Sequence, residues 1–339
     1  MNFIDYLFKN RKHIYCANGL FSPLNRIGGY NVAHTIDTVI SENYNKYENH
    51  KFSFLPFRDT QQDEIISENK SKIIYDLDIQ NLKKSGAIIG RLDGIAKDSG
   101  VCMEIGYAYS MGIPIGVFST DFICESFPSH IGCPDLDFDP IVTCISTYQH
   151  HYKEMPNGEK LYEKQNQDLE NYMVSDFINT CLCEFDKLKT FINPPVYQTN
   201  NDLLAYVDIQ GGKYEWAKEE QNQIFQKLTS FGLQPMSASR YNIGSNVLFN
   251  AKVDLDNLLS SKLAIFSADN IEMDTGSAVL FGISVGLNIK TVLLYTSPVV
   301  LKGAGGQVMK QNLMIEQAAD IVCSSKKELY LQIKKEHNE

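Results

Sequence analysis

Short apolar runs alternate along the chain with longer segments in which apolar residues recur at helical spacing. The runs rich in β-branched and aromatic residues predict strands at residues 13–18, 51–57, 86–94 and 113–119. Helices are predicted between them, over about 20–42, over 71–85 and from Ser99 onward. Strands that alternate with helices indicate a parallel sheet with helices on both faces, so the expected fold class is α/β.

The pattern changes between about residues 150 and 200. A polar stretch, HHYKEMPNGEK, precedes a long helical pattern over 161–191, and the segment NPPVYQTNN that follows is typical of a linker. We therefore predict a first domain over 1–150, a helical insert and linker over 151–200, and a second domain over 201–339.

An internal repeat supports two copies of one fold. Shifting the chain by 176 residues matches the following pairs without a gap: Asp78 with Asp254, Leu82 with Leu258, Ser85 with Ser261, Ile89 with Ile265, Asp93 with Asp269, Asp98 with Asp274, Gly100 with Gly276, Gly106 with Gly282 and Ile113 with Ile289. The alternative is a chance similarity between two strand–helix–strand units, but the shared acidic and glycine positions favour duplication. Glu104 falls on Leu280, so the second copy lacks that carboxylate.

Composition narrows the possible partners. The 339 residues are 43% hydrophobic, and 31 Lys and Arg against 41 Asp and Glu give a net charge of −10 without any long basic run. This balance argues against nucleic acid or an anionic membrane as the main partner and leaves a small-molecule ligand open. We interpret the first residues as lacking a cleavable leader, and no apolar stretch approaches a membrane span, so we expect a cytoplasmic protein.

The eight cysteines give no sign of a metal site. No CxxC pair or Cys/His cluster has the spacing of zinc ligands, and Cys181 and Cys183 are the only close pair. We expect free thiols and no bound metal.

Three carboxylates are candidates for chemistry. Glu104 and Asp98 lie at the start of the helix predicted from Ser99, where the helix dipole favours an ionised carboxylate and where an open α/β sheet binds its ligands. Asp78 lies one helix before the strand that leads there. Paired carboxylates suit glycosidic chemistry, with one as nucleophile and the other handling the proton of the leaving group. The alternatives are that Glu104 is solvated, that Asp78 is a surface residue and that Asp98 only caps the helix.

Three motifs carry a resemblance to a known family: HIYCANGLFSPLNR, DLDIQNLKKSGAIIGRLDG and KDSGVCMEIGYAYSMGIP. Together they resemble the nucleoside 2-deoxyribosyltransferases, closely over about 12–121 and more weakly over about 203–325. The resemblance implies a flavodoxin-like or Rossmann-like α/β fold and a double displacement that needs no cofactor.

The resemblance also implies roles for individual residues. Glu104 would attack C1′ of a 2′-deoxyribonucleoside, Asp78 would protonate the leaving base, and the hydroxyl of Tyr15 would hold Glu104. Asp98 would accept a hydrogen bond from the 5′-hydroxyl of the sugar, next to Gly100 of the same motif. Because Asp98 would repel a phosphate dianion, free nucleosides are favoured over nucleotides.

The base-binding residues are less well defined by the sequence. Phe21 and Phe57 are candidates for stacking on the base, although either suits the core equally well. The polar residues 58–62 lie where family members contact the base, and the sequence does not choose among them.

The family is oligomeric, and a neighbouring subunit supplies an Asn in an N-x-M context. Here Asn312 and Met314 provide that context after the LLYTS run of the second half, and the corresponding segment of the first half, after VFSTDF, shows no N-x-M. The nucleophile, in contrast, is present in the first copy and absent from the second. We therefore expect an intrachain pseudo-dimer with one working site completed by Asn312, and the sequence leaves open whether pseudo-dimers assemble into a further homo-oligomer. The alternative is that Asn312 is a loop residue and the second half is only a scaffold.

The expected function is thus exchange of the base of 2′-deoxyribonucleosides through a deoxyribosyl-Glu intermediate, with a nucleoside and a free nucleobase as ligands. Hydrolysis of the same bond in a deoxynucleoside or deoxynucleotide is one alternative, because the sequence does not show whether water enters the pocket. A nucleoside or nucleotide sensor without turnover is the other. A retained nucleophile argues against the sensor.

Overall fold

The structure is a computed structural model, and it describes residues 2–20, 22–47, 50–94, 96–121, 136–152, 166–188, 203–209, 215–240, 246–270, 272–302 and 308–338. The predicted linker 193–201 and Phe21 lie outside these residues.

Two five-stranded parallel sheets organise the chain. In spatial order, the first contains β2 (Ser53–Phe54), β1 (His13–Ala17), β3 (Ser85–Arg91), β4 (Ile115–Ser119) and β5 (Tyr148–His151). The second contains β7 (Gln234–Ser237), β6 (Leu204–Asp208), β8 (Leu263–Ser267), β9 (Lys290–Leu294) and β12 (Ile321–Cys323). Both sheets follow the order 2-1-3-4-5 of the flavodoxin-like folds. The predicted fold class, a Rossmann-like α/β sheet present twice, is confirmed.

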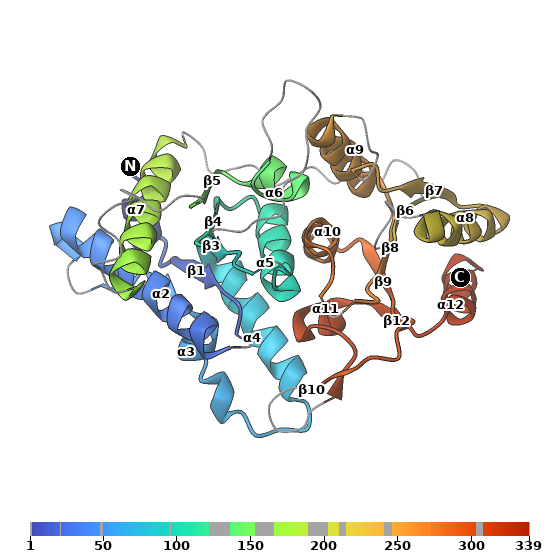
Figure 1. Ribbon diagram of the computed structural model, residues 1–339, viewed down its shortest axis with the longest axis horizontal. Helices are drawn as coiled ribbons and strands as arrows, with labels where there is room; N and C mark the ends of the chain where they lie inside the picture. Colours follow the sequence, from blue (N-terminus) through green and yellow to red (C-terminus); the bar gives the residue numbers. More distant parts are fainter. Residues whose placement is uncertain are drawn as a thin grey trace.

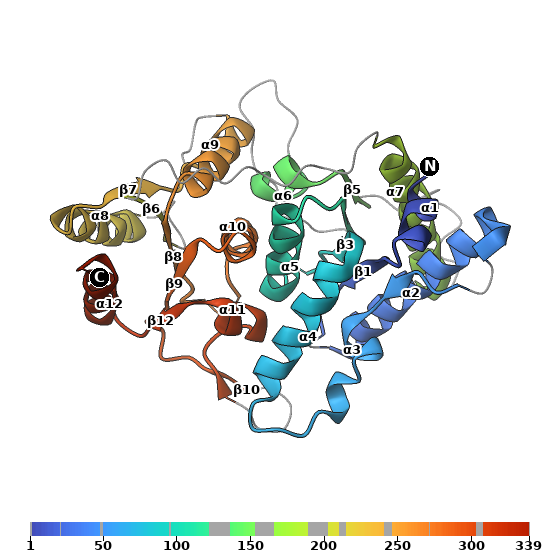
Figure 2. The same ribbon diagram turned by 180° about the vertical axis from the view of Figure 1, so that it is seen from behind.

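Helices cover both faces of each sheet (Figures 1 and 2). Those of the first half are α1 (Phe3–Lys9), α2 (Pro23–Asn43), α3 (Pro56–Asp59), α4 (Lys70–Lys84), α5 (Ser99–Ser110), α6 (Pro140–Ile145) and α7 (Asn166–Lys187). Those of the second half are α8 (Glu215–Ser230), α9 (Val247–Leu259), α10 (Thr275–Gly286), α11 (Leu313–Ala318) and α12 (Lys326–Asn338). A hairpin of β10 (Leu301–Lys302) and β11 (Val308–Met309) precedes α11. None of the helices in the described ranges has the length and apolar character that crossing a bilayer requires.

The two halves meet through α5 and α10, which lie side by side at the centre of the molecule (Figure 1). A Cβ on Gly106 would overlap the carbonyl oxygen of Val279, and a Cβ on Gly282 would overlap that of Met103. Gly106 and Gly282, which the repeat matches, are therefore points at which the backbones of the two helices approach closely. One hydrophobic core continues from the inner face of the first sheet across this contact to the second.

Residues near the end of the first half differ from their prediction in two ways. The start of the polar stretch forms β5, the edge strand of the first sheet, which pairs with β4. The helix α7, expected in an insert, packs on the outer face of the first sheet, where Phe177 stacks on Phe118 with ring centroids 4.5 Å apart. The division of the chain into domains stays a prediction.

The strand predicted over 51–57 is shorter in the structure. Only Ser53 and Phe54 pair with β1, because Pro56 occupies the first position of α3 and ends the extended segment. This early turn directs Phe57 and the residues after it toward the carboxyl end of β1.

Candidate active site

A pocket opens beside α5, and both halves of the chain line it. Its first-half residues are Asn18, Leu20, Arg26, Pro56, Phe57, Gln62, Asp63, Lys70, Ser71, Ile74, Asp78, Asp98, Gly100, Val101 and Glu104. Its second-half residues are Met309, Asn312, Leu313 and Met314, from β11 and the start of α11.

Glu104 points into the molecule and not to bulk solvent, with only 6% of its surface exposed. The hydroxyl of Tyr15, on β1, donates a hydrogen bond of 2.6 Å to its Oε1. Burial and the nearby charge of Asp78 raise the pKa of Glu104 well above its usual value, while the bond from Tyr15 lowers it. Glu104 lies in the second turn of α5, beyond the short reach of the helix dipole, so Tyr15 is the group that favours its ionised form.

Asp78 is also buried, on the face of α4 that borders the pocket, and is 3% exposed. Its Oδ1 accepts a hydrogen bond of 2.7 Å from Nε2 of Gln62. Burial raises the pKa of Asp78 well above its usual value, and the bond from Gln62 lowers it. Both carboxyls therefore take up a proton more readily than exposed ones, and a charge on Asp78 disfavours a second charge on Glu104.

Asp98 and Asn312 connect the two halves at the rim of this pocket. Oδ1 of Asp98 accepts hydrogen bonds from the backbone N–H groups of Gly100 and Val101, at 2.9 and 3.2 Å, and so caps α5. The same oxygen accepts a bond of 3.1 Å from Nδ2 of Asn312. A Cβ on Gly100 would lie 2.8 Å from Oδ1 of Asn312, so the glycine allows this approach. Asp98 therefore both caps α5 and lines the pocket.

Some of the remaining predicted residues line the pocket and others do not. Phe57 and Met314 line the pocket, and the backbone N–H of Met314 donates to Oδ1 of Asn312 at 3.1 Å. Among the polar residues 58–62, only Gln62 lines the pocket; Arg58 instead pairs with Asp59 at 2.7 Å. Gln62 and Met309 were not singled out by the sequence. Phe21 lies outside the described residues.

The second half contains the counterpart of this site. Tyr206 of β6 pairs with Ala264 as Tyr15 pairs with Ile88, so the two tyrosines occupy the same register. Asp254 and Asp274 take the places of Asp78 and Asp98 in the repeat. The acidic and tyrosine positions of the site thus recur, but Glu104 is replaced by the buried Leu280.

Arg240 fills this counterpart site. The residue is buried, with 5% of its surface exposed. Its guanidinium forms ion pairs with three carboxylates, at 2.8 Å from Asp208, 3.3 Å from Asp254 and 3.2 Å from Asp274. It also donates a hydrogen bond of 2.6 Å to the hydroxyl of Ser277. Burial raises the pKa of Asp208 and of Asp254, and the charge of Arg240 lowers both. A guanidinium therefore occupies the position that the first half leaves open as a pocket.

Comparison with known families agrees with this asymmetry. Residues 31–173 match the sequence model of the family described as nucleoside 2-deoxyribosyltransferase. This part of the chain is similar to that family. No curated protein has a sequence that matches the chain.

The family match covers α2 to the start of α7, and with it Asp78, Asp98 and Glu104. This similarity supports an enzyme of the nucleoside deoxyribosyltransferase type with small nucleoside substrates. Within the described ranges, no three or more His, Cys, Asp and Glu side chains are grouped to hold a metal ion.

Proposed function

We propose that this protein exchanges the base of 2′-deoxyribonucleosides, with Glu104 as the nucleophile. The observation that carries the proposal is that Glu104 and Asp78 are buried in one pocket and that the hydroxyl of Tyr15 donates a hydrogen bond to Glu104. A buried carboxylate with a hydrogen-bond donor on one oxygen leaves the other oxygen available to a substrate carbon.

In the first half-reaction, Glu104 is ionised and Asp78 is protonated. A carboxylate oxygen of Glu104 forms a bond to C1′ as the bond from C1′ to the base nitrogen breaks. The electron pair of that bond goes to the base, and Asp78 transfers its proton to it. The neighbouring carboxylate stabilises the positive charge that develops on the sugar in the transition state.

In the second half-reaction, a nitrogen of the incoming base attacks C1′ and the ester bond to Glu104 breaks. The electron pair returns to the carboxylate, and the proton released from the incoming base goes to Asp78. Two displacements at C1′ preserve the configuration of the nucleoside. The bond from Tyr15 stabilises Glu104 as it leaves, since a donor favours the carboxylate over the ester.

Transfer to a base is favoured over transfer to water by the apolar wall of the pocket. Phe57, Met309, Leu313 and Met314 line the pocket beside the two carboxyls, and three of the four come from the second half. Apolar side chains at the reacting centre limit the entry of water, which competes with the acceptor base.

We further propose that the chain is an intrachain pseudo-dimer with one working site. The recurring strand order, the reciprocal glycine contacts of α5 and α10 and the closed counterpart site support an origin by duplication. In this interpretation Asn312 of the second half positions Asp98 toward the sugar. The domain limits expected from the sequence, 1–150 and 201–339, belong to the same proposal.

Chromatography of a reaction mixture tests the function directly. The protein is incubated with deoxyinosine and free cytosine, and the expected product is deoxycytidine together with hypoxanthine. Hypoxanthine without a new nucleoside would indicate a hydrolase, and neither product would indicate a sensor. Mass spectrometry of the protein incubated with deoxyinosine alone should find a deoxyribosyl group on Glu104, and Glu104→Gln should form neither adduct nor product.

A further inference from the structure

A second, polar pocket adjoins the active pocket. The two pockets share Asn18 and Asp98, but the second contains neither Glu104 nor Asp78. Its lining consists of Asn18, Gly19, Asn25, Arg91, Asp93, Ala96, Asp98 and Glu272. A group bound at Glu104 and extending past Asp98 therefore enters this second pocket.

Glu272 reaches this pocket from the second half of the chain, from the loop before α10. Its Oε2 accepts a hydrogen bond of 2.9 Å from the backbone N–H of Ser99 and a second bond from the Ser99 hydroxyl. These bonds fix the carboxylate at the start of α5, next to the cap residue Asp98. Burial and then the charge of Glu272 raise the pKa of Asp98 to about 6, so the field of Glu272 acts at the junction of the two pockets.

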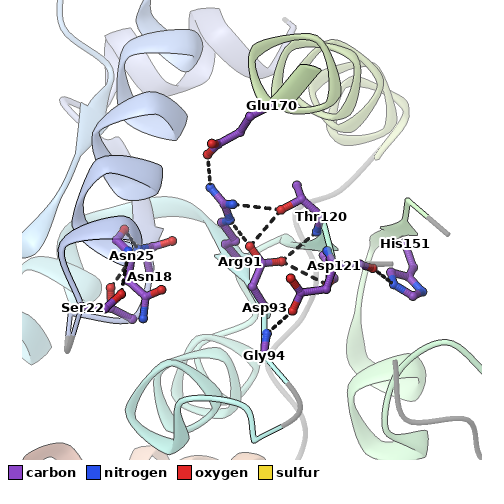
Figure 3. Close-up of polar contacts among 12 residues, drawn as sticks. Asn18, Ser22, Asn25, Arg91, Asp93, Gly94, Thr120, Asp121, His151 and Glu170 are labelled. Carbon is purple, nitrogen blue, oxygen red and sulfur yellow. Dashed lines mark hydrogen bonds and ion pairs between the residues drawn. The ribbon is translucent and has the colours of Figure 1, made fainter. Parts of the chain in front are cut away.

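Among the described residues, Arg91 is the cation that lines the second pocket, and other groups hold it. Arg91 donates from Nη1 to Glu170 at 2.6 Å, from Nη2 to Thr120 at 2.9 Å and from Nε to Asp93, as Figure 3 shows. All three guanidinium nitrogens are thus engaged, and two carboxylates offset its charge. Asp98 and Glu272 add negative charge to the same lining, so a further anion in this pocket is repelled.

The repeat gives Glu272 no acidic counterpart in the first half. Shifting the chain by 176 residues places Ala96 on Glu272, so the first half has no carboxylate at the corresponding position. Glu272 therefore lines the second pocket, which adjoins the pocket of Glu104, and the repeat provides no equivalent of it in the first half. The carboxylate that the first half places at the start of α10 is Asp139, from a different position, since a Cβ on Gly276 would lie 2.6 Å from its Oδ1.

We propose that Glu272 is a specificity-determining residue that admits nucleosides with an uncharged or cationic 5′ group and excludes those with a 5′ phosphate. The inference rests on the proposed function. With C1′ at Glu104 and the base at Asp78, the part of the sugar that remains is directed toward Asp98. The exocyclic 5′ carbon is its longest extension, and a group on that carbon reaches the second pocket and Glu272.

Three substrates that share one base and differ in the 5′ group test this proposal: thymidine, 5′-amino-5′-deoxythymidine and thymidine 5′-phosphate. We expect wild-type kcat/KM for release or exchange of thymine to be highest for the amine and lowest for the phosphate. Glu272→Gln keeps an acceptor for Ser99 but removes the charge. This variant should raise the kcat/KM of the 5′-phosphate relative to that of thymidine about tenfold. It should lower the kcat/KM of the 5′-amine relative to that of thymidine by a similar factor.

Asp269→Asn is the matched control. Asp269 lies in the same loop and accepts a backbone bond of 2.9 Å from Ser297, but it lines neither pocket, so both ratios should stay at wild-type values. If thymidine turns over and Glu272→Gln leaves both ratios unchanged, the inference is wrong and the proposed function stands. If no substrate is cleaved, both are wrong. Should Glu272→Gln fail to fold, the wild-type series decides, because a phosphate cleaved as fast as thymidine contradicts the inference.

Discussion

The side chains of Asn312 and Asp98 are joined by a hydrogen bond of 3.1 Å although 214 residues separate them in the sequence. Asn312 caps α11 in the second half, and Asp98 caps α5 in the first. The contact therefore fixes one helix start against the other at the edge of the pocket. It is the structural link through which the second half reaches the candidate catalytic residues.

Replacing Asn312 with Ala should lower kcat/KM for base exchange by about 10- to 100-fold, because Asp98 loses the donor that orients it. The variant also loses a helix cap, at a cost of about 1 kcal/mol in the free energy of unfolding. Steady-state kinetics and thermal unfolding measure the two effects.

Asn246→Ala provides the control for the lost cap. Asn246 caps α9 through a bond of 3.0 Å from the Phe249 N–H and lies away from the pocket, so this variant should lose similar stability and keep its activity. Normal turnover in Asn312→Ala would show that the second half is only a scaffold.

The buried carboxyls of the working site should make the protein less stable as the pH rises. Asp78 and Glu104 have raised pKa values in the folded state, so each contributes full stability below its unfolded pKa and loses it as the pH rises through the folded value. Asp78→Asn should therefore raise the unfolding temperature at pH 8 by a few degrees and leave it nearly unchanged at pH 4. It should also abolish base exchange. Calorimetry at both pH values checks this expectation.

Replacing Arg240 in the counterpart site should destabilise the protein at neutral pH, whereas Asp78→Asn should stabilise it. Arg240→Met leaves Asp208 and Asp254 buried without their cation, which should lower the free energy of unfolding by about 3–5 kcal/mol at neutral pH. Because these carboxyls gain protons more readily once the cation is gone, the loss should shrink as the pH falls. An unfolding free energy equal to that of the wild type would contradict the assignment of Arg240 as the group that stabilises the closed site.

Tyr15 should control the pH at which the enzyme becomes active. Its hydrogen bond lowers the pKa of Glu104, and the nucleophile must be ionised, so Tyr15→Phe should shift the acidic limb of the pH profile of kcat/KM to higher pH. Tyr206→Phe changes the equivalent tyrosine of the closed site and should leave the profile unchanged. An unshifted acidic limb in Tyr15→Phe would mean that Glu104 is not the titrating group.

The sequence predicted the sheets and the carboxyls because both depend on local patterns. Strands β1, β3 and β4 are continuous apolar runs, as buried parallel strands require. Asp98 caps α5 and Glu104 lies within the first two turns of the same helix, so the sequence alone placed both near its start. The repeat then identified the second sheet.

Other features depend on contacts that periodicity does not encode. Gln62 reaches Asp78 from a short turn after Gln61, whose φ of 51° is left-handed, and no sequence pattern marks that conformation. Arg240 and Glu272 act on residues that are close only in the folded chain. The edge strand β5 lies in a run of His, Gln and Tyr, which has the polarity of a loop and is half exposed.

Gly106 and Gly100 lie on one helix but should respond differently to replacement by Ala. A Cβ on Gly106 would meet the backbone of α10, which can yield only if the helices separate, so Gly106→Ala should cost about 1–3 kcal/mol or more of unfolding free energy. A Cβ on Gly100 would meet only the side chains of Asn312 and Asp98. Gly100→Ala should therefore unfold near the wild-type temperature and exchange bases more slowly. Denaturant unfolding and kinetics of the two variants distinguish the contact between the halves from the site itself. A Gly106→Ala protein as stable as the wild type would show that α5 and α10 do not approach as closely as the contact between Gly106 and Val279 requires.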